Sequence, residues 1–178
     1  TGSFLEVADR KKNYMRINGM ENFSARHSNA KMNITGTDVS NQIYTGTGDD
    51  YIQGMGGNDT IRGKGGDDII SGGTGNDYIY GDTNNDLLIG GEGIDRLSGG
   101  IGADTFRLST GNSLDHIMDF RDGQDKIEIR DIDGFENVIV RPGAGGNAHI
   151  FDLNGHNMVA VVYGVDAADL TIQGEVIA

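Results

Sequence analysis

Aspartate recurs every nine residues in the middle of the chain, and this spacing is the clearest sign of chemistry in the sequence. Seven consecutive nonapeptides between residues 45 and 107 carry aspartate at their sixth position. They are Asp50, Asp59, Asp68, Asp77, Asp86, Asp95 and Asp104. Carboxylates brought together in this way repel one another and favour a hard cation that takes about six to eight oxygen ligands. The spacing therefore predicts bound Ca²⁺, because the smaller Mg²⁺ demands stricter octahedral geometry.

The other positions of each nonapeptide supply the turn and the strand that would position the aspartate. The fourth position is glycine in six of the seven repeats, and glycine adopts positive φ in tight turns without steric cost. These candidate turn residues are Gly48, Gly57, Gly66, Gly75, Gly93 and Gly102. The eighth position is always large and apolar. Each repeat is thus expected to form a tight turn and a short strand whose middle side chain points inward.

Two successive nonapeptides would form one 18-residue coil, and stacked coils would lie about 4.8 Å apart, as paired strands do. Stacking then creates two rows of carboxylates. One row contains Asp50, Asp68, Asp86 and Asp104, and the other contains Asp59, Asp77 and Asp95. Neighbours within the rows form five pairs, and a sixth pair would include Asn41 of the degenerate repeat 36–44. We therefore expect about five or six calcium ions.

The consensus GGxGxD, followed by x-apolar-x, resembles the RTX (repeats-in-toxin, hemolysin-type) calcium-binding repeat. The chain is also similar in pattern to the C-terminal modules of alginate C5-epimerases and serralysin proteases. This resemblance implies a right-handed parallel β-roll whose aspartates and turn glycines hold the ions. It further implies a type I secreted bacterial protein, exported by that secretion machinery to the extracellular space or the cell surface.

The flanking segments predict an all-β chain in three parts. Residues 1–35 are expected to form a cap of short strands, residues 36–107 the calcium β-roll, and residues 108–178 a β cap with antiparallel strands. The dipeptide Asn154-Gly155 between two apolar runs predicts a hairpin there. The segment SLDHIMDFRDGQDKIEIRDI resembles the one that closes the roll in serralysin-type proteases. That resemblance implies one further calcium site, formed by Asp115, Asp119 and Asp125.

Composition excludes several other functions. A net charge of −13 argues against nucleic-acid binding, which needs a basic surface. No apolar run reaches the roughly 18 residues of a transmembrane segment. The chain has no cysteine, no GxSxG and no HExxH, so we expect no catalytic site within it. A disordered acidic linker is disfavoured, because such linkers do not keep a nine-residue phase with an apolar eighth position.

The seventh and ninth positions of alternate repeats should project from one outer face of the roll. Five of these side chains are candidates for ligand binding, namely Tyr44, Arg62, Tyr78, Tyr80 and Arg96. Aromatic rings that stack on sugars, together with guanidinium groups that pair with carboxylates, suit an anionic, alginate-like polysaccharide. The opposite face carries the apolar residues Tyr51, Ile69, Leu87 and Ile89, which we expect a cap to cover.

The sequence thus predicts a non-catalytic, calcium-binding β-roll module of a secreted bacterial protein. Such a module would fold on extracellular calcium and support secretion and stability. Two alternatives stay open. The chain could be the accessory C-terminal domain of a secreted enzyme (an epimerase, metalloprotease or lipase), or a segment of an RTX adhesin.

Overall fold

The computed structural model describes residues 4–6, 14–19, 22–109, 113–130, 138–152, 158–170, 172–173 and 176–177. These residues form strands, bends and turns, as the all-β prediction requires. Within these ranges no helix is long and apolar enough to cross a membrane.

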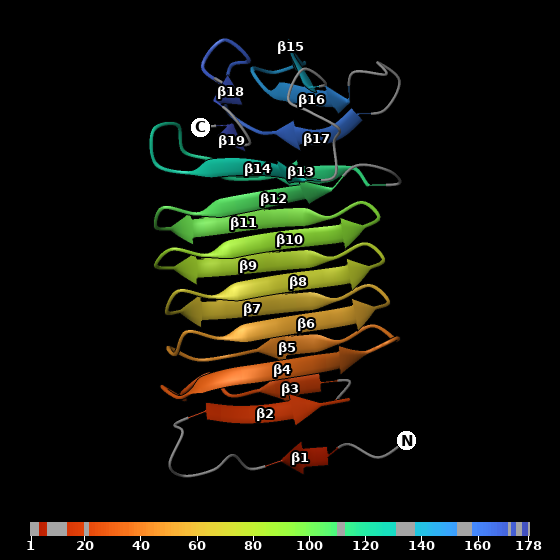
Figure 1. Cartoon of the computed structure of the whole chain (residues 1–178), viewed down its shortest axis with the longest axis vertical. Helices are drawn as coiled ribbons and strands as arrows, with labels where there is room; N and C mark the ends of the chain where they lie inside the picture. Colours follow the sequence, from red (N-terminus) through yellow and green to blue (C-terminus); the bar gives the residue numbers. More distant parts are fainter. Residues whose placement is uncertain are drawn as a thin grey trace.

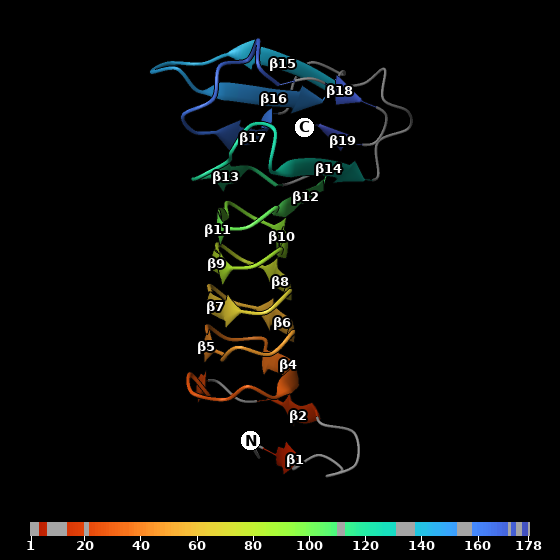
Figure 2. The ribbon, with the colours of Figure 1, turned by 90° about the vertical axis from the view of Figure 1, so that its left-hand side faces the viewer.

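Two long sheets face each other along the molecule, and Figure 2 shows them edge-on. In spatial order, sheet A contains β1 (Phe4–Glu6), β2 (Tyr14–Asn18), β4 (Lys31–Thr37), β6 (Tyr51–Gly56), β8 (Ile69–Thr74), β10 (Leu87–Glu92), β12 (Thr105–Ser109), β14 (Lys126–Arg130), β19 (Val176–Ile177) and β18 (Ile172–Gln173). Sheet B contains β15 (Val138–Pro142), β16 (Ala148–Asp152), β17 (Met158–Val162), β13 (Asp115–Ile117), β11 (Arg96–Ile101), β9 (Tyr78–Thr83), β7 (Thr60–Gly65), β5 (Gln42–Tyr44) and β3 (Asn22–Ser24).

From β2 to β14 successive strands alternate between the sheets, and each of the strands β2 to β12 pairs in parallel with the strand two places further along the chain (Figure 1). The register in the roll matches the predicted 18-residue coil. Ile52 pairs with Ile70, Ile70 with Leu88, and Leu88 with Phe106. The parallel β-solenoid predicted from the repeat is therefore confirmed.

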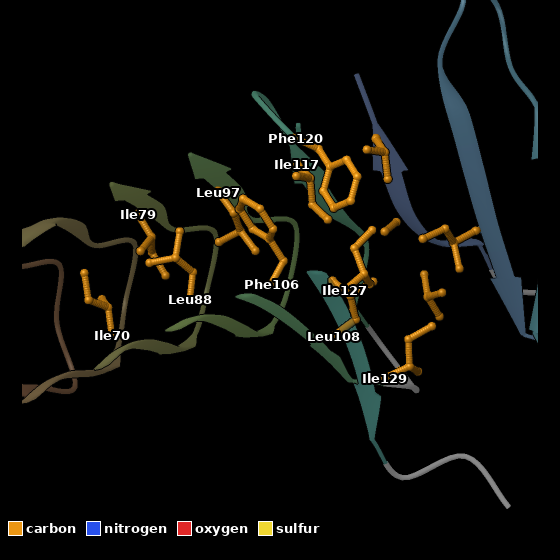
Figure 3. Packing of buried hydrophobic residues seen from close by; sticks show 14 of the residues in the cluster. Ile70, Ile79, Leu88, Leu97, Phe106, Leu108, Ile117, Phe120, Ile127 and Ile129 are labelled. Carbon is orange, nitrogen blue, oxygen red and sulfur yellow. The ribbon is translucent and has the colours of Figure 1, made fainter. Parts of the chain in front are cut away.

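The core is a thin double column of eighth-position side chains between the sheets (Figure 3). Ile70, Ile79, Leu88, Leu97 and Phe106 are all completely buried. At the C-terminal end the column widens, because Leu108, Phe120 and Ile129 also turn inward. Each coil thus buries only a few apolar side chains, and the turns must contribute to stability by other means.

The parallel stack extends further at both ends than the expected boundaries of the caps. At the N-terminal end, β2 and β3 pair in parallel with β4 and β5, so residues before 36 already belong to the coils. At the C-terminal end, β13 and β14 continue the parallel stack before the antiparallel pairs β15–β16, β16–β17, β14–β19 and β18–β19 close it. Both expected boundaries, 35/36 and 107/108, therefore fall inside strands, and the three-part division stays a prediction. Asn154-Gly155 lies outside the described residues.

The expectation that a cap covers the apolar stripe on sheet A is wrong for the residues that the structure describes. Tyr51 remains 37% exposed and Ile69 40% exposed, while Leu87 and Ile89 are partly buried. The physical reason is that both ends of the chain add strands to the edges of the sheets, as Figure 1 shows, and so do not fold back over the outer face.

Candidate metal centres

The sixth-position aspartates stack in two rows because each one directly precedes a strand of the parallel ladder. Within a row, the backbone N–H of one aspartate donates to Oδ1 of the aspartate one coil further on. The donor–acceptor distances are 2.7 Å for Asp50–Asp68 and Asp59–Asp77, 2.9 Å for Asp68–Asp86, 2.8 Å for Asp77–Asp95 and 3.0 Å for Asp86–Asp104. One carboxylate oxygen of each accepting aspartate is therefore used in a hydrogen bond between coils.

The second carboxylate oxygen has no hydrogen-bond partner. Oδ2 is buried and unpaired in Asp50, Asp59, Asp68, Asp77, Asp86, Asp95, Asp104 and Asp115. Native proteins rarely leave buried polar atoms unpaired, because each such atom costs about 1–3 kcal/mol and a charged one more. Seven identical exceptions at the sixth repeat position, with Asp115 as an eighth beyond the repeats, indicate that a group outside the chain binds them.

The first-position glycines lie directly beneath these oxygens, and the sequence analysis did not single them out. We call them the glycine floor; they are Gly54, Gly63, Gly72, Gly81, Gly90 and Gly99. A Cβ on Gly54 would lie 2.1 Å from Asp59 Oδ2 and 2.5 Å from the carbonyl oxygen of Gly72. A Cβ on Gly72 would likewise meet Asp77 Oδ2 at 2.1 Å and the Gly90 carbonyl at 2.7 Å. An aspartate Oδ2 lies over every first-position glycine, and at Gly54, Gly72 and Gly81 a carbonyl oxygen from the next coil converges with it. The signal was present, since six of the seven repeats begin with glycine.

Turn geometry explains the remaining glycines. Five of the six predicted fourth-position glycines have positive φ, from 89° at Gly57 to 158° at Gly102, whereas Gly48 does not. Six of the seven second positions also adopt positive φ, even where the residue is Met55, Lys64 or Asp82, with values of 82–85°. A side chain in this left-handed region costs about 1–2 kcal/mol. The turn conformation is therefore kept although it places four non-glycine residues, the three above and Asn84 at a fourth position, in the left-handed region.

Fifth-position side chains form a second ladder that runs in the opposite direction along the outside of the turns. Asn58 Oδ1 accepts the N–H of Asn76 at 2.8 Å, and Asn76 Oδ1 accepts the N–H of Ile94 at 2.8 Å. Asp49 and Asp67 do the same on the other edge, each at 3.0 Å. These exposed groups connect the coils through hydrogen bonds and leave the buried Oδ2 atoms untouched.

Burial raises the pKa of the seven sixth-position aspartates above the ordinary value of 3.8. Desolvation is the largest cause throughout, and repulsion from neighbouring carboxylates adds to it at Asp68 between Asp50 and Asp86. The pKa reaches about 8 at Asp68 and about 7 at Asp77 and Asp86. Without a cation, the rows therefore resist ionisation near neutral pH.

Asp115, Asp119 and Asp125 do not form the single site that the resemblance implied. Asp115 extends the row of Asp95 in sheet B, and Asp125 extends the row of Asp104 in sheet A, where Asp125 Oδ1 accepts the N–H of Asp104 at 3.0 Å. Asp119 instead anchors a turn, because its oxygens accept bonds from the Ser98 hydroxyl and from the N–H groups of Gly99 and Gly100 at 2.7–3.0 Å.

No group of three or more His, Cys, Asp or Glu side chains converges anywhere in the described ranges. A metal site would therefore combine two row carboxylates with turn carbonyls. Calcium accepts such mixed oxygen sets at flexible geometry. The unpaired Oδ2 atoms, the converging carbonyls and the glycine floor fit this ion.

The five candidate ligand-binding residues do share the outer face of sheet B. Tyr44, Arg62 and Tyr80 are consecutive in register, as are Tyr78 and Arg96. The guanidinium of Arg62 lies 5.6 Å from the Tyr80 ring centroid, and that of Arg96 lies 5.2 Å from the Tyr78 ring centroid. Arg62 is also held by both carboxylate oxygens of Asp82, which leaves it less available to a ligand.

The profile of the RTX calcium-binding nonapeptide repeat matches four overlapping segments, 35–70, 54–88, 62–97 and 80–114. Residues 35–114 are therefore similar to the RTX calcium-binding nonapeptide repeat. No curated protein sequence matches the chain. Among solved structures, the chain is similar to the extracellular lipase LipA from Serratia marcescens, with 15% sequence identity and a TM-score of 0.36. That match covers 88% of this chain and only 41% of the lipase.

Proposed function

We propose that this chain is a non-catalytic module of a secreted bacterial protein and that it folds when it binds extracellular calcium. The observation that carries the proposal is the set of buried, unpaired Oδ2 atoms along the two aspartate rows. Because the core of each coil is thin, metal binding energy would supply much of the folding energy, as it does in small metal-dependent domains.

The proposed ions lie between neighbouring aspartates of a row. Five of these steps are Asp50–Asp68, Asp68–Asp86, Asp86–Asp104, Asp59–Asp77 and Asp77–Asp95. We add Asp95–Asp115, because a Cβ on Gly90 would lie 2.3 Å from Asp95 Oδ2 and 3.0 Å from Asp115 Oδ1. The ions would supply positive charge to the carboxylates, and about six of them would nearly balance the net charge of −13.

Export follows from the same dependence on calcium. Extracellular-type sites bind calcium with Kd of about 10⁻⁴–10⁻³ M. At the much lower calcium concentration of the cytosol the rows would stay empty, and the chain would remain unfolded and suitable for type I secretion. After export it would fold outside the cell or at the cell surface.

A calcium titration tests the proposal. The chain is dialysed free of metal at pH 7.5, and far-UV circular dichroism is followed while native mass spectrometry counts bound ions. We expect a cooperative gain of β structure with about five or six ions per chain. A chain that binds no calcium, or is fully folded in chelator, refutes the proposed function.

A second candidate function is binding of an anionic polysaccharide to the outer face of sheet B. This face supports it because Arg26, Arg62 and Arg96 each lie against a tyrosine ring, which is an unusual concentration of cations in an acidic chain. Stacked rings and guanidinium groups are suited to sugar rings and their carboxylates. The accessory domain of a secreted enzyme and the RTX adhesin segment remain alternatives for the protein as a whole.

Matched arginine variants test this surface. Arg96→Ala removes a guanidinium from sheet B, and Arg107→Ala removes one from sheet A, where it pairs with Glu128. In calcium, we expect Arg96→Ala to weaken retention on immobilised alginate, and Arg107→Ala to leave it unchanged. Equal retention of Arg96→Ala and wild type would contradict the polysaccharide site while leaving the calcium proposal intact.

A further inference from the structure

We propose that the first turn of the roll, residues 36–41, closes without calcium because the side-chain amide of Asn41 replaces the ion. The inference rests on the proposed calcium sites of the later turns and specifies where their row begins. It also decides against the sixth pair that the sequence suggested between Asn41 and Asp59.

Asn41 occupies the same place in its coil as the row aspartates do in theirs. It is 2% exposed, and its N–H donates to Asp59 Oδ1 at 2.7 Å, as in the steps Asp59–Asp77 and Asp77–Asp95. A Cβ on Gly36 would lie 2.1 Å from Asn41 Oδ1 and 2.5 Å from the Gly54 carbonyl oxygen. These distances equal those of Asp59 Oδ2 and the Gly72 carbonyl over Gly54. Asn41 Oδ1 thus stands where an aspartate has its unpaired oxygen.

The Asn41 amide, however, leaves no atom unpaired. Oδ1 accepts the Thr37 N–H at 2.8 Å. Nδ2 donates to the Val39 carbonyl oxygen at 2.7 Å and to the Thr37 hydroxyl at 2.9 Å. Only this orientation of the amide satisfies both the N–H and the carbonyl, and a carboxylate could not donate to either oxygen. The NH₂ group therefore bridges the Val39 carbonyl and the Thr37 hydroxyl, so that the turn closes through its own side chain.

The backbone of this turn also differs from that of the turns from residue 54 onward. Its second and fourth positions are Thr37 and Val39, and neither has positive φ. In the turn at residues 72–77, the equivalent Gly73 and Gly75 have φ of 114° and 123°. Because β-branched residues avoid the left-handed region, the sequence of the first turn opposes the calcium-turn conformation. Both the Asn41 side chain and the backbone conformation therefore favour a turn that is closed by its own hydrogen bonds.

In the second turn of the same coil, a protein side chain also replaces part of what an ion would bind. Thr45 stands at the first position, where the next six repeats have glycine, and its hydroxyl donates to the Gly63 carbonyl at 2.7 Å. One oxygen of the Asp50–Asp68 step is therefore already bonded. The first coil, residues 36–53, is consequently the least calcium-dependent end of the roll, and on the Asn41 edge the ions begin at Asp59–Asp77.

Ion counting on variants of the whole chain tests the inference. In Asn41→Ala we expect the same number of bound ions as in wild type, whereas Asp77→Ala should lose at least one. In the reverse experiment, residues 37–41 take the sequence of residues 73–77 (Thr37→Gly, Asp38→Thr, Val39→Gly, Ser40→Asn and Asn41→Asp), and we expect one additional ion. Asn58→Asp is the control, since it makes the same asparagine-to-aspartate change at an exposed turn position, and it should add no ion.

The outcomes separate the two proposals. If wild type binds calcium and Asn41→Ala loses an ion, the inference is overturned and the proposed function stands. If the grafted turn folds in calcium without an additional ion, the inference is also overturned, because the turn sequence does not then decide occupancy. A wild-type chain that binds no calcium overturns the proposed function and this inference with it.

Discussion

Removal of calcium at pH 7.5 should unfold the roll, and the structure gives the size of the effect. Eight Oδ2 atoms are buried without a partner. At about 1–3 kcal/mol for each, they would destabilise the calcium-free fold by about 8–24 kcal/mol, before any charge repulsion is included. Globular domains are stable by only about 5–15 kcal/mol in total. The calcium-free chain should therefore be largely unfolded near neutral pH.

The assay is far-UV circular dichroism and amide hydrogen exchange in chelator, with magnesium as the control ion. We expect the amides of the roll strands to exchange rapidly in chelator and in magnesium, and slowly in calcium. Protection of Ile70, Ile79 and Leu88 in chelator at pH 7.5 would refute the reasoning, since it would mean that the unpaired oxygens are tolerated or satisfied by water.

The pH dependence of the calcium-free chain provides an independent check. The folded-state pKa of Asp68 is about 8 and that of Asp77 about 7, both above the ordinary value of 3.8 expected for the unfolded chain. Groups with raised pKa values favour the folded state at low pH and lose that contribution as pH rises through the folded-state pKa. In chelator, β structure should therefore be greatest near pH 4 and should disappear between about pH 6 and 8. The opposite trend would contradict the burial of the rows.

Three further substitutions have expected outcomes in saturating calcium. Gly72→Ala should lose an ion by native mass spectrometry, because its Cβ would lie 2.1 Å from Asp77 Oδ2; an unchanged count would contradict the glycine floor. Lys64→Gly should raise the free energy of unfolding in urea by about 0.5–1 kcal/mol, because φ is 85° there, and a decrease would show that strain is absent. Ile79→Ala should lower it by about 2–5 kcal/mol, and a much smaller loss would mean that the thin core collapses around the gap.

The sequence by itself determined the repeating part of the fold. A strict nine-residue phase leaves one way to stack coils with every eighth side chain inside, and Ile52, Ile70 and Leu88 accordingly form one buried column. The same phase places Asp59 beside Asp77. Period and register are local properties repeated without interruption, so they can be read directly from the chain.

The tertiary structure decided everything that depends on a break in that period. Asp115 follows Asp95 by 20 residues and Asp125 follows Asp104 by 21, so extrapolation by 18 does not place them in their rows. Asp119 lies between them and bonds to Ser98, Gly99 and Gly100 of β11 instead. The proposed role of Asn41 could not be predicted from the sequence either, because asparagine and aspartate have side chains of the same shape and fit the repeat equally well. They differ in that the asparagine NH₂ group donates hydrogen bonds, and only the folded turn places the Val39 carbonyl where it accepts one.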